Sequence, residues 1–70
     1  MDFNVVSKEL LGANKLKKSG IIMLHNKNIE FSFVTENIRC DSETKVIYID
    51  DNSHITYIDS DAIECIKIYI

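Results

Sequence analysis

The chain contains no proline, no tryptophan and only two glycines among its 70 residues. Without proline, its turns have to be formed by clusters of Asn, Asp and Ser, whose side chains hydrogen-bond the local backbone. It also has only two cysteines, Cys40 and Cys65, which are too few for a disulfide-stabilised secreted scaffold. We therefore expect free thiols and asparagine- or aspartate-rich turns.

Long apolar segments are also missing, because no run approaches the roughly 20 apolar residues that a membrane-crossing helix needs. The first residues, Met1-Asp2-Phe3-Asn4, are not a basic signal segment. We expect a cytoplasmic protein with no membrane partner. The length indicates a single domain over residues 1–70, with an N-terminal helical segment at 1–19 and a β part at 20–70. A domain this small buries only roughly 60% of its unfolded surface, so self-association is an expected source of further stability.

The formal net charge of −3 is unevenly distributed. Residues 1–20 carry four lysines against two carboxylates, whereas the remaining residues carry four cations against nine carboxylates. An acidic β part repels phosphate backbones, so nucleic-acid binding through the sheet is disfavoured.

Two segments near the C-terminus, residues 45–50 and 65–70, place bulky apolar side chains at both odd and even positions. Successive side chains of a strand point to opposite faces, so burying one face would leave apolar residues on the other. The sequence predicts that something covers this second face.

A helix is predicted over residues 7–18, starting at Ser7 as the N-cap. Leu10, Ala13 and Leu16 recur at three-residue spacing and would form its buried face. Gly12 is unfavourable in a helix interior, so two short turns are the alternative. Gly20 would mark the point at which the chain leaves the helix.

From Gly20 onward, the pattern indicates strands. Residues 20–25 and 29–34 flank Asn26-Lys27-Asn28 and predict a hairpin. The extended pattern continues through Cys40, which would make the second strand long and bent. A second hairpin is predicted from 45–50 and 54–58 around Asp51-Asn52-Ser53.

The register of this second hairpin decides which side chains are buried. If Asp50 opposes His54, the core receives Ile47, Ile49, Ile55 and Tyr57, and the other face receives Val46, Tyr48 and Ile58. We favour this register. A slip by one residue would instead group Val46, Tyr48, Ile55 and Tyr57.

A 3₁₀ turn is predicted over residues 59–64, before the last strand, where Asp61 and Glu64 have the spacing of a capping box. The predicted fold is mostly β (α+β): a short N-terminal helix, then a strongly bent five-stranded antiparallel sheet or small barrel. This order of elements resembles that of SH3-like barrels and, with the preceding helix, most closely the Sm-like order. The glycine in the second strand and the Arg-Gly near the fourth that characterise Sm proteins are missing, so neither the Sm ring nor its RNA site is implied.

No pattern indicates catalysis. The spacing of His25, His54, Cys40 and Cys65 does not match compact zinc sites, and glycine-rich phosphate loops and nucleophile elbows are missing. We expect no enzyme activity, no cofactor and no bound metal.

Two sets of residues are candidates for interaction. Antiparallel connections bring two turns to one end of the second hairpin, which predicts an acidic patch of Asp41, Glu43, Asp59 and Asp61. Tyrosines are typical of interfaces, and the last strand has no charged residue after Lys67 to protect its edge. The predicted interface consists of Val46, Tyr48, Ile58, Ile66, Ile68, Tyr69 and Ile70.

These features favour a non-enzymatic protein that binds a protein partner and self-associates as a homo-oligomer. The Ile-, Asn- and Lys-rich usage suggests an AT-rich bacterial or phage genome, and hence an inhibitor of a host factor. A second hypothesis is an Sm-like or SH3-like nucleic-acid-binding module that uses Lys8, Lys15, Lys17 and Lys18. A third is an oligomer that sequesters a small nucleotide between subunits.

Overall fold

Helix α1 (Phe3–Lys15) begins earlier than predicted, because Asp2 rather than Ser7 is its N-cap. The Asp2 carboxylate accepts hydrogen bonds from the backbone N–H groups of Asn4 and Val5, at 2.8 and 3.4 Å. The helix is continuous through Gly12, whose position faces open space. Its buried face is made by residues three or four apart, namely Phe3, Val6, Leu10 and Ala13.

The helix ends in a Schellman arrangement at Lys17, not at Gly20. Lys17 has a positive φ of 50° and donates its N–H to the Asn14 carbonyl, while Lys18 donates to the Ala13 carbonyl at 2.9 Å. Leu16 therefore leaves the helical face and is 70% exposed, which corrects its predicted place in the buried stripe.

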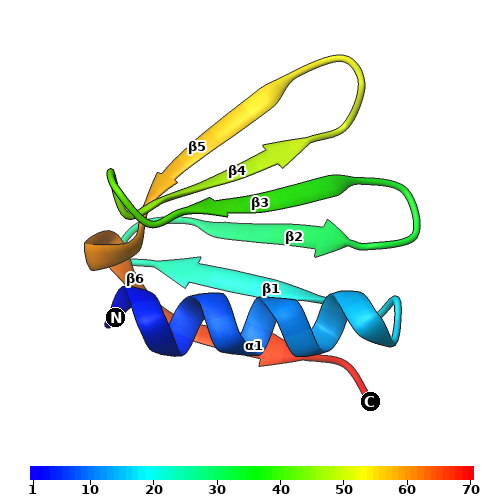
Figure 1. Cartoon of the computed structure of the whole chain (residues 1–70), viewed down its shortest axis with the longest axis horizontal. Coiled ribbons are helices and arrows are strands. Elements are labelled where there is room, and N and C mark those ends of the chain that lie inside the picture. The colour runs from blue at the N-terminus through cyan, green and yellow to red at the C-terminus, as the bar shows by residue number, and fades with distance from the viewer.

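The computed structural model describes all 70 residues and contains six strands rather than five (Figure 1). The strands are β1 (Ser19–Leu24), β2 (Asn28–Ser32), β3 (Asn37–Asp41), β4 (Val46–Asp50), β5 (Ile55–Asp59) and β6 (Ile63–Ile68). The predicted 3₁₀ turn is confirmed as η1 (Ser60–Ala62), although its N-cap is Asp59 instead of Asp61.

The predicted long second strand is divided into β2 and β3 by a turn over residues 33–36. Glu36 closes this turn twice: its N–H donates to the Ser32 carbonyl, and its carboxylate accepts from the Ser32 N–H at 2.7 Å. A polar side chain that caps its own turn ends the strand at Ser32.

The strands form two three-stranded antiparallel sheets, β2-β1-β6 and β3-β4-β5. Both predicted hairpins are confirmed, and the last strand returns to pair with β1. In Figure 1, β6 passes behind α1, β1 runs alongside the helix, and the β4–β5 hairpin lies farthest from it. One core contains the helix face and side chains from all six strands or their ends, including Ile22, Phe31, Ile38, Ile47 and Ile63.

The favoured register of the β4–β5 hairpin is wrong, and the one-residue slip is the observed pairing. Asp50 pairs with Ile55 and Ile47 pairs with Ile58. Ile58 is therefore buried at 3% exposure, while Ile55 and Tyr57 are 45% and 65% exposed. A shift of one residue moves every side chain of a strand to the opposite face, which explains why all three assignments changed together.

The close approach of β6 and β2 to β1 explains why residue 20 is a glycine. A Cβ at Gly20 would overlap the backbone oxygen of Lys67 and would lie 2.9 Å from Cζ of Phe31. Gly20 thus allows β1 to pack between β6 and an aromatic ring of β2.

Candidate interaction surface

The outward face of the β3-β4-β5 sheet is organised around a row of three side chains. Arg39, Tyr48 and Tyr57 are cross-strand neighbours on β3, β4 and β5. The two tyrosine rings meet edge to face with centroids 5.1 Å apart, and the Arg39 guanidinium lies 5.8 Å from the Tyr48 ring centroid. These contacts hold the three side chains together on the surface.

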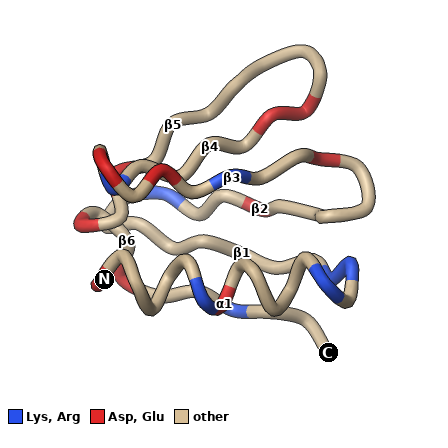
Figure 2. The backbone as a smooth tube through the Cα atoms, viewed as in Figure 1, with Lys and Arg blue, Asp and Glu red and all other residues tan.

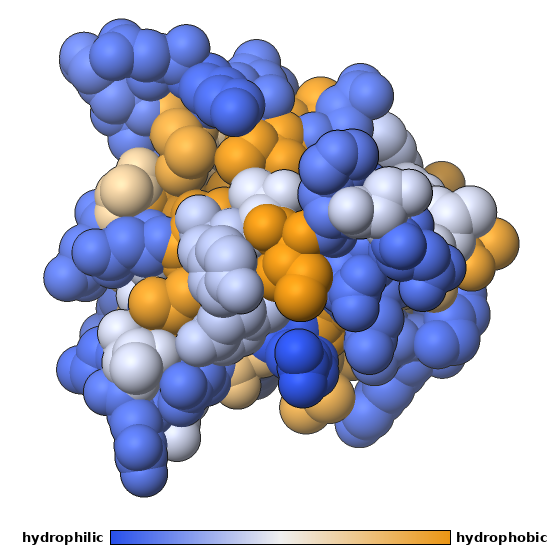
Figure 3. All heavy atoms as spheres, turned by 90° about the horizontal axis from the view of Figure 1, so that it is seen from above, coloured by the Kyte–Doolittle hydropathy of each residue, from blue (hydrophilic) through white to orange (hydrophobic).

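The rows on either side combine apolar and acidic side chains. Val46 lies between Asp41 and Asp59 in one row, and Asp50 pairs with Ile55 in the other. We call this surface the tyrosine face; it consists of Arg39, Asp41, Val46, Tyr48, Asp50, Ile55, Tyr57 and Asp59. Figure 3, seen from the side of the β4–β5 hairpin, shows apolar side chains gathered in the centre and hydrophilic ones around them.

Two carboxylates at or near this face, Asp41 and Asp51, are held in their charged form by hydrogen bonds. Hydrogen bonds from the backbone N–H of Glu43 and from the Thr44 hydroxyl lower the pKa of Asp41. Backbone N–H groups of His54 and Ser53 likewise lower the pKa of Asp51 in the β4–β5 turn. Asp41 on the tyrosine face and Asp51 beside it are therefore negatively charged at neutral pH.

The predicted acidic patch is partly assembled. Asp41 and Asp59 flank Val46 on neighbouring strands, whereas Glu43 belongs to the β3–β4 turn and Asp61 to η1, at the same end of the sheet (Figure 2). No group of three His, Cys, Asp or Glu side chains in the structure is placed to hold a metal ion.

The four residues considered for zinc do not form a group that is placed to hold a metal ion. His25 is 3.5 Å from Glu64, and His54 is 3.7 Å from Asp51, both on the surface. The two cysteines are free and half-buried. Burial raises the pKa of the Cys40 thiol, and a hydrogen bond with Ser7 partly offsets this effect.

The predicted interface residues of the C-terminal strand are divided between core and surface. Ile66 and Ile68 are half-buried and pack against the core, so they are shared with the interior. Tyr69 is 48% exposed and Ile70 is fully exposed. Of the other predicted interface residues, Val46 and Tyr48 lie on the tyrosine face, but Ile58 lies in the core.

Tyr69 and Ile70 line a groove that the sequence does not reveal. We call it the helix groove; it has a volume of about 390 Å³ and is lined by Lys8, Glu9, Gly12, Ala13, Leu16, Lys18, Ile68, Tyr69 and Ile70. Most of its exposed surface is apolar. It forms where the end of β6 passes beneath α1, and this contact depends on the tertiary structure.

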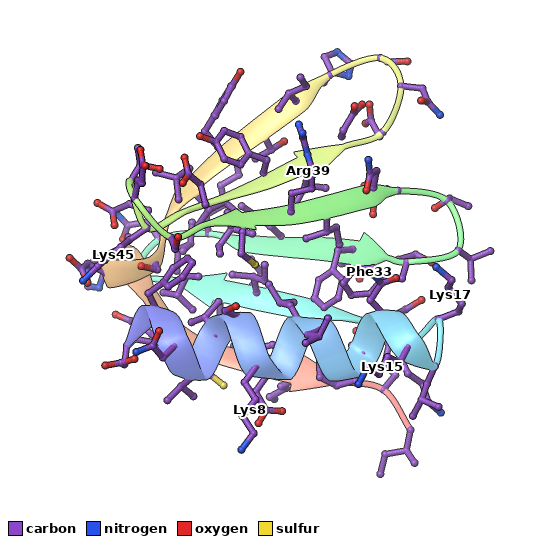
Figure 4. The ribbon with its side chains drawn as sticks, viewed as in Figure 1. Lys8, Lys15, Lys17, Phe33, Arg39 and Lys45 are labelled. Atoms are coloured by element: carbon purple, nitrogen blue, oxygen red, sulfur yellow. The ribbon has the colours of Figure 1, made fainter.

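The four lysines proposed for nucleic-acid contact divide between this groove and the end of the helix. Lys8 and Lys18 line the groove. Lys17 donates a hydrogen bond to the Asn14 side chain at 3.0 Å, and Lys15 lies in the last helical turn. In Figure 4, Lys8 projects from α1 on the side opposite to Arg39, so the helix groove and the tyrosine face lie at opposite ends of the molecule.

Sequence reasoning missed Arg39 and Tyr57 as surface residues. Residue types gave no signal for this, because the observed pairing of Thr56 with the buried Ile49 turns the polar Thr56 toward the core and Tyr57 outward.

Comparisons with known proteins add no family to this geometry. No protein-family model matches the chain, and no curated protein or solved structure matches it either. The only α-helix has 13 residues, and no helix of the structure is long and apolar enough to cross a membrane.

Proposed function

We propose that this protein is a non-enzymatic binding protein that acts through its tyrosine face. The observation that carries the proposal is the row of Arg39, Tyr48 and Tyr57, held by mutual aromatic and cation–π contacts on an open sheet surface. Tyrosine and arginine are the residue types that dominate binding energy in protein interfaces. Their contacts on β3, β4 and β5 order them before a partner arrives, which reduces the entropy lost on binding.

The charges of the surface define the partner. Asp41 and Asp59 lie at one end of the tyrosine face, and Asp50 lies at the other. A partner with a central aliphatic or aromatic side chain and flanking lysines or arginines would match both the apolar centre and the acidic ends. We propose that such a protein surface is the target.

The proposal includes self-association, a cytoplasmic location and an origin in a phage or mobile element whose product inhibits a host factor. It also includes a small barrel of Sm-like order, which is supported by the helix, the 3₁₀ turn before the last strand and the pairing of β6 with β1.

A peptide selection tests the proposal. Random displayed peptides are selected on the wild-type protein at low concentration, after depletion on a Tyr48→Ser/Tyr57→Ser variant. The enriched peptides should contain Lys or Arg on both sides of an apolar residue and bind the variant at least tenfold more weakly. Amide chemical-shift changes on titration should concentrate in β3, β4 and β5.

A Tyr69→Ser variant is the matched control, because Tyr69 is also exposed but lies outside the tyrosine face. Its affinity should equal that of the wild type. Peptides that bind the double variant equally well, or shift changes confined to other elements, would refute this role of the face.

Nucleic-acid binding is the second candidate, and the exposure of Lys8, Lys15 and Lys17 favours it. It requires salt-dependent binding to RNA or DNA that is lost when these lysines are replaced. No binding at low salt would rule it out.

A further inference from the structure

The helix groove carries the chemical features that the tyrosine face requires of a partner. Its apolar part includes Leu16 and Tyr69, which are 70% and 48% exposed. Lys8 and Lys18 both line it. The groove is therefore an exposed apolar surface on which two lysines outnumber one carboxylate, Glu9. The tyrosine face is an exposed apolar surface on which three aspartates outnumber one arginine, Arg39.

The spacing of the charges is also compatible. Asp50 lies four residues along β4 from Val46, whose row contains Asp59, so the two acidic ends are about 13 Å apart. The lysines of the groove are Lys8 and Lys18. The helix rises about 10 Å from Lys8 to its last residue, Lys15, and Lys18 follows three residues later in the chain. Lysine side chains are long and flexible enough to accommodate the difference.

We infer that the tyrosine face of one copy of this chain docks into the helix groove of a second copy. The inference rests on the proposed function, since it names a partner for the same face. The two surfaces differ and lie at opposite ends of the molecule, so the contact is heterologous and repeats head to tail. Each added copy leaves one free groove and one free tyrosine face, unless the chain of copies closes into a ring.

Exposed ion pairs are individually weak and are screened by salt. The apolar centre, formed by Tyr57, Val46 and Ile55 against Leu16 and Tyr69, provides the attraction that salt does not remove. The association is accordingly expected to depend on both concentration and ionic strength.

Charge reversal with rescue in trans tests the inference. Sedimentation velocity is measured from 10 µM to 1 mM protein in 50 mM and 500 mM salt. The wild-type mass should rise with concentration and fall at high salt. Lys8→Glu/Lys18→Glu and Asp50→Lys/Asp59→Lys should each associate at least tenfold more weakly at 50 mM salt. An equal mixture of the two variants should regain the wild-type mass, because both contacts again join opposite charges.

The matched control is Lys27→Glu/Lys67→Glu, which changes the charge equally at exposed positions outside both surfaces and should associate like the wild type. Asp50 and Asp59 also accept local backbone hydrogen bonds. If their lysine variant does not fold, Asp50→Asn/Asp59→Asn keeps an accepting oxygen and should still weaken association.

A wild-type protein that stays monomeric at 1 mM in low salt would overturn the inference. So would self-association that neither reversal weakens, or a mixture of folded variants that fails to recover. Peptide binding by Lys8→Glu/Lys18→Glu separates the two proposals, because this variant retains an intact tyrosine face. Peptide binding without head-to-tail assembly would support the binding role of the tyrosine face and overturn only the inference about its partner.

Discussion

Tyr48 and Tyr57 face each other across the β4–β5 pair, with ring planes at 77° and centroids 5.1 Å apart. This contact lies on the outside of the sheet, where Tyr57 is 65% exposed. A pair of aromatic rings held edge to face on an open surface stabilises the hairpin and at the same time presents both rings to a partner.

The tyrosine contact should be measurable as a coupling energy. In a double-mutant cycle of Tyr48→Ala and Tyr57→Ala, urea denaturation should give a coupling of about 0.5–1 kcal/mol in favour of the pair. The same cycle with Tyr57→Ala and Tyr69→Ala should give additive changes, since Tyr69 lies after β6 in the other sheet. A coupling of zero between Tyr48 and Tyr57 would mean that the ring contact has no energetic role.

The two glycines should respond to alanine in opposite directions. Gly20→Ala should lower the free energy of unfolding by about 3 kcal/mol, because the new methyl group would collide with the Lys67 backbone and the Phe31 ring. Gly12→Ala should raise it by about 0.5–1 kcal/mol, because the methyl group meets open space in a helix interior. Chemical denaturation of both variants decides this, and a tolerated Gly20→Ala would contradict the close packing of β1 against β6.

The observed register of the second hairpin should appear as a large difference between two isoleucines. Ile58→Ala removes a side chain that is 3% exposed and should cost about 2–5 kcal/mol of stability. Ile55→Ala, at 45% exposure, should cost clearly less than half of that amount. The two changes remove the same atoms, so the comparison isolates burial. Equal losses would instead favour a hairpin with shifted pairing.

Stability should fall in acid because of the turn aspartates. Folding lowers the pKa of Asp41 and of Asp51, so their stabilising effect is complete above the unfolded value of about 3.9 and is lost as the pH falls through the folded pKa. Urea denaturation between pH 2.5 and 6 should show this loss. Asp41→Asn should be less stable at pH 6 and less sensitive to acid. A pH profile identical to that of the wild type would show that the Asp41 hydrogen bonds do not contribute.

Much of the β arrangement is predictable from local residue types. Asn26-Lys27-Asn28 and Asp51-Asn52-Ser53 indicated both hairpins, since these residues tolerate turn conformations that strands do not. The division of the long second strand was missed because Glu36 caps the turn through its side chain, and no apolar pattern reports such a bond. The N-cap of the helix is Asp2, five residues before the predicted Ser7, and both residues are good N-caps by type.

The residues exposed on the tyrosine face depended on the register of one hairpin. A strand can pair in either of two registers one residue apart, and the two registers turn opposite faces of the strand inward. Both faces of β5 carry apolar side chains, Ile55 and Tyr57 on one and Ile58 on the other. The packing of Ile58 into the shared core selected one register and left Tyr57 outside. The helix groove arises in the same way, from the end of β6 passing the end of α1.

The sequence by itself determined the helix, the two hairpins, the 3₁₀ turn and the acidic character of the β part, because these follow from local backbone preferences and charge. Only the tertiary structure decided which apolar residues of the C-terminal half are buried and which form the tyrosine face. The physical reason is that burial is a property of the whole core: the helix and both sheets compete for the same interior, and the side chains that pack there best exclude the others to the surface.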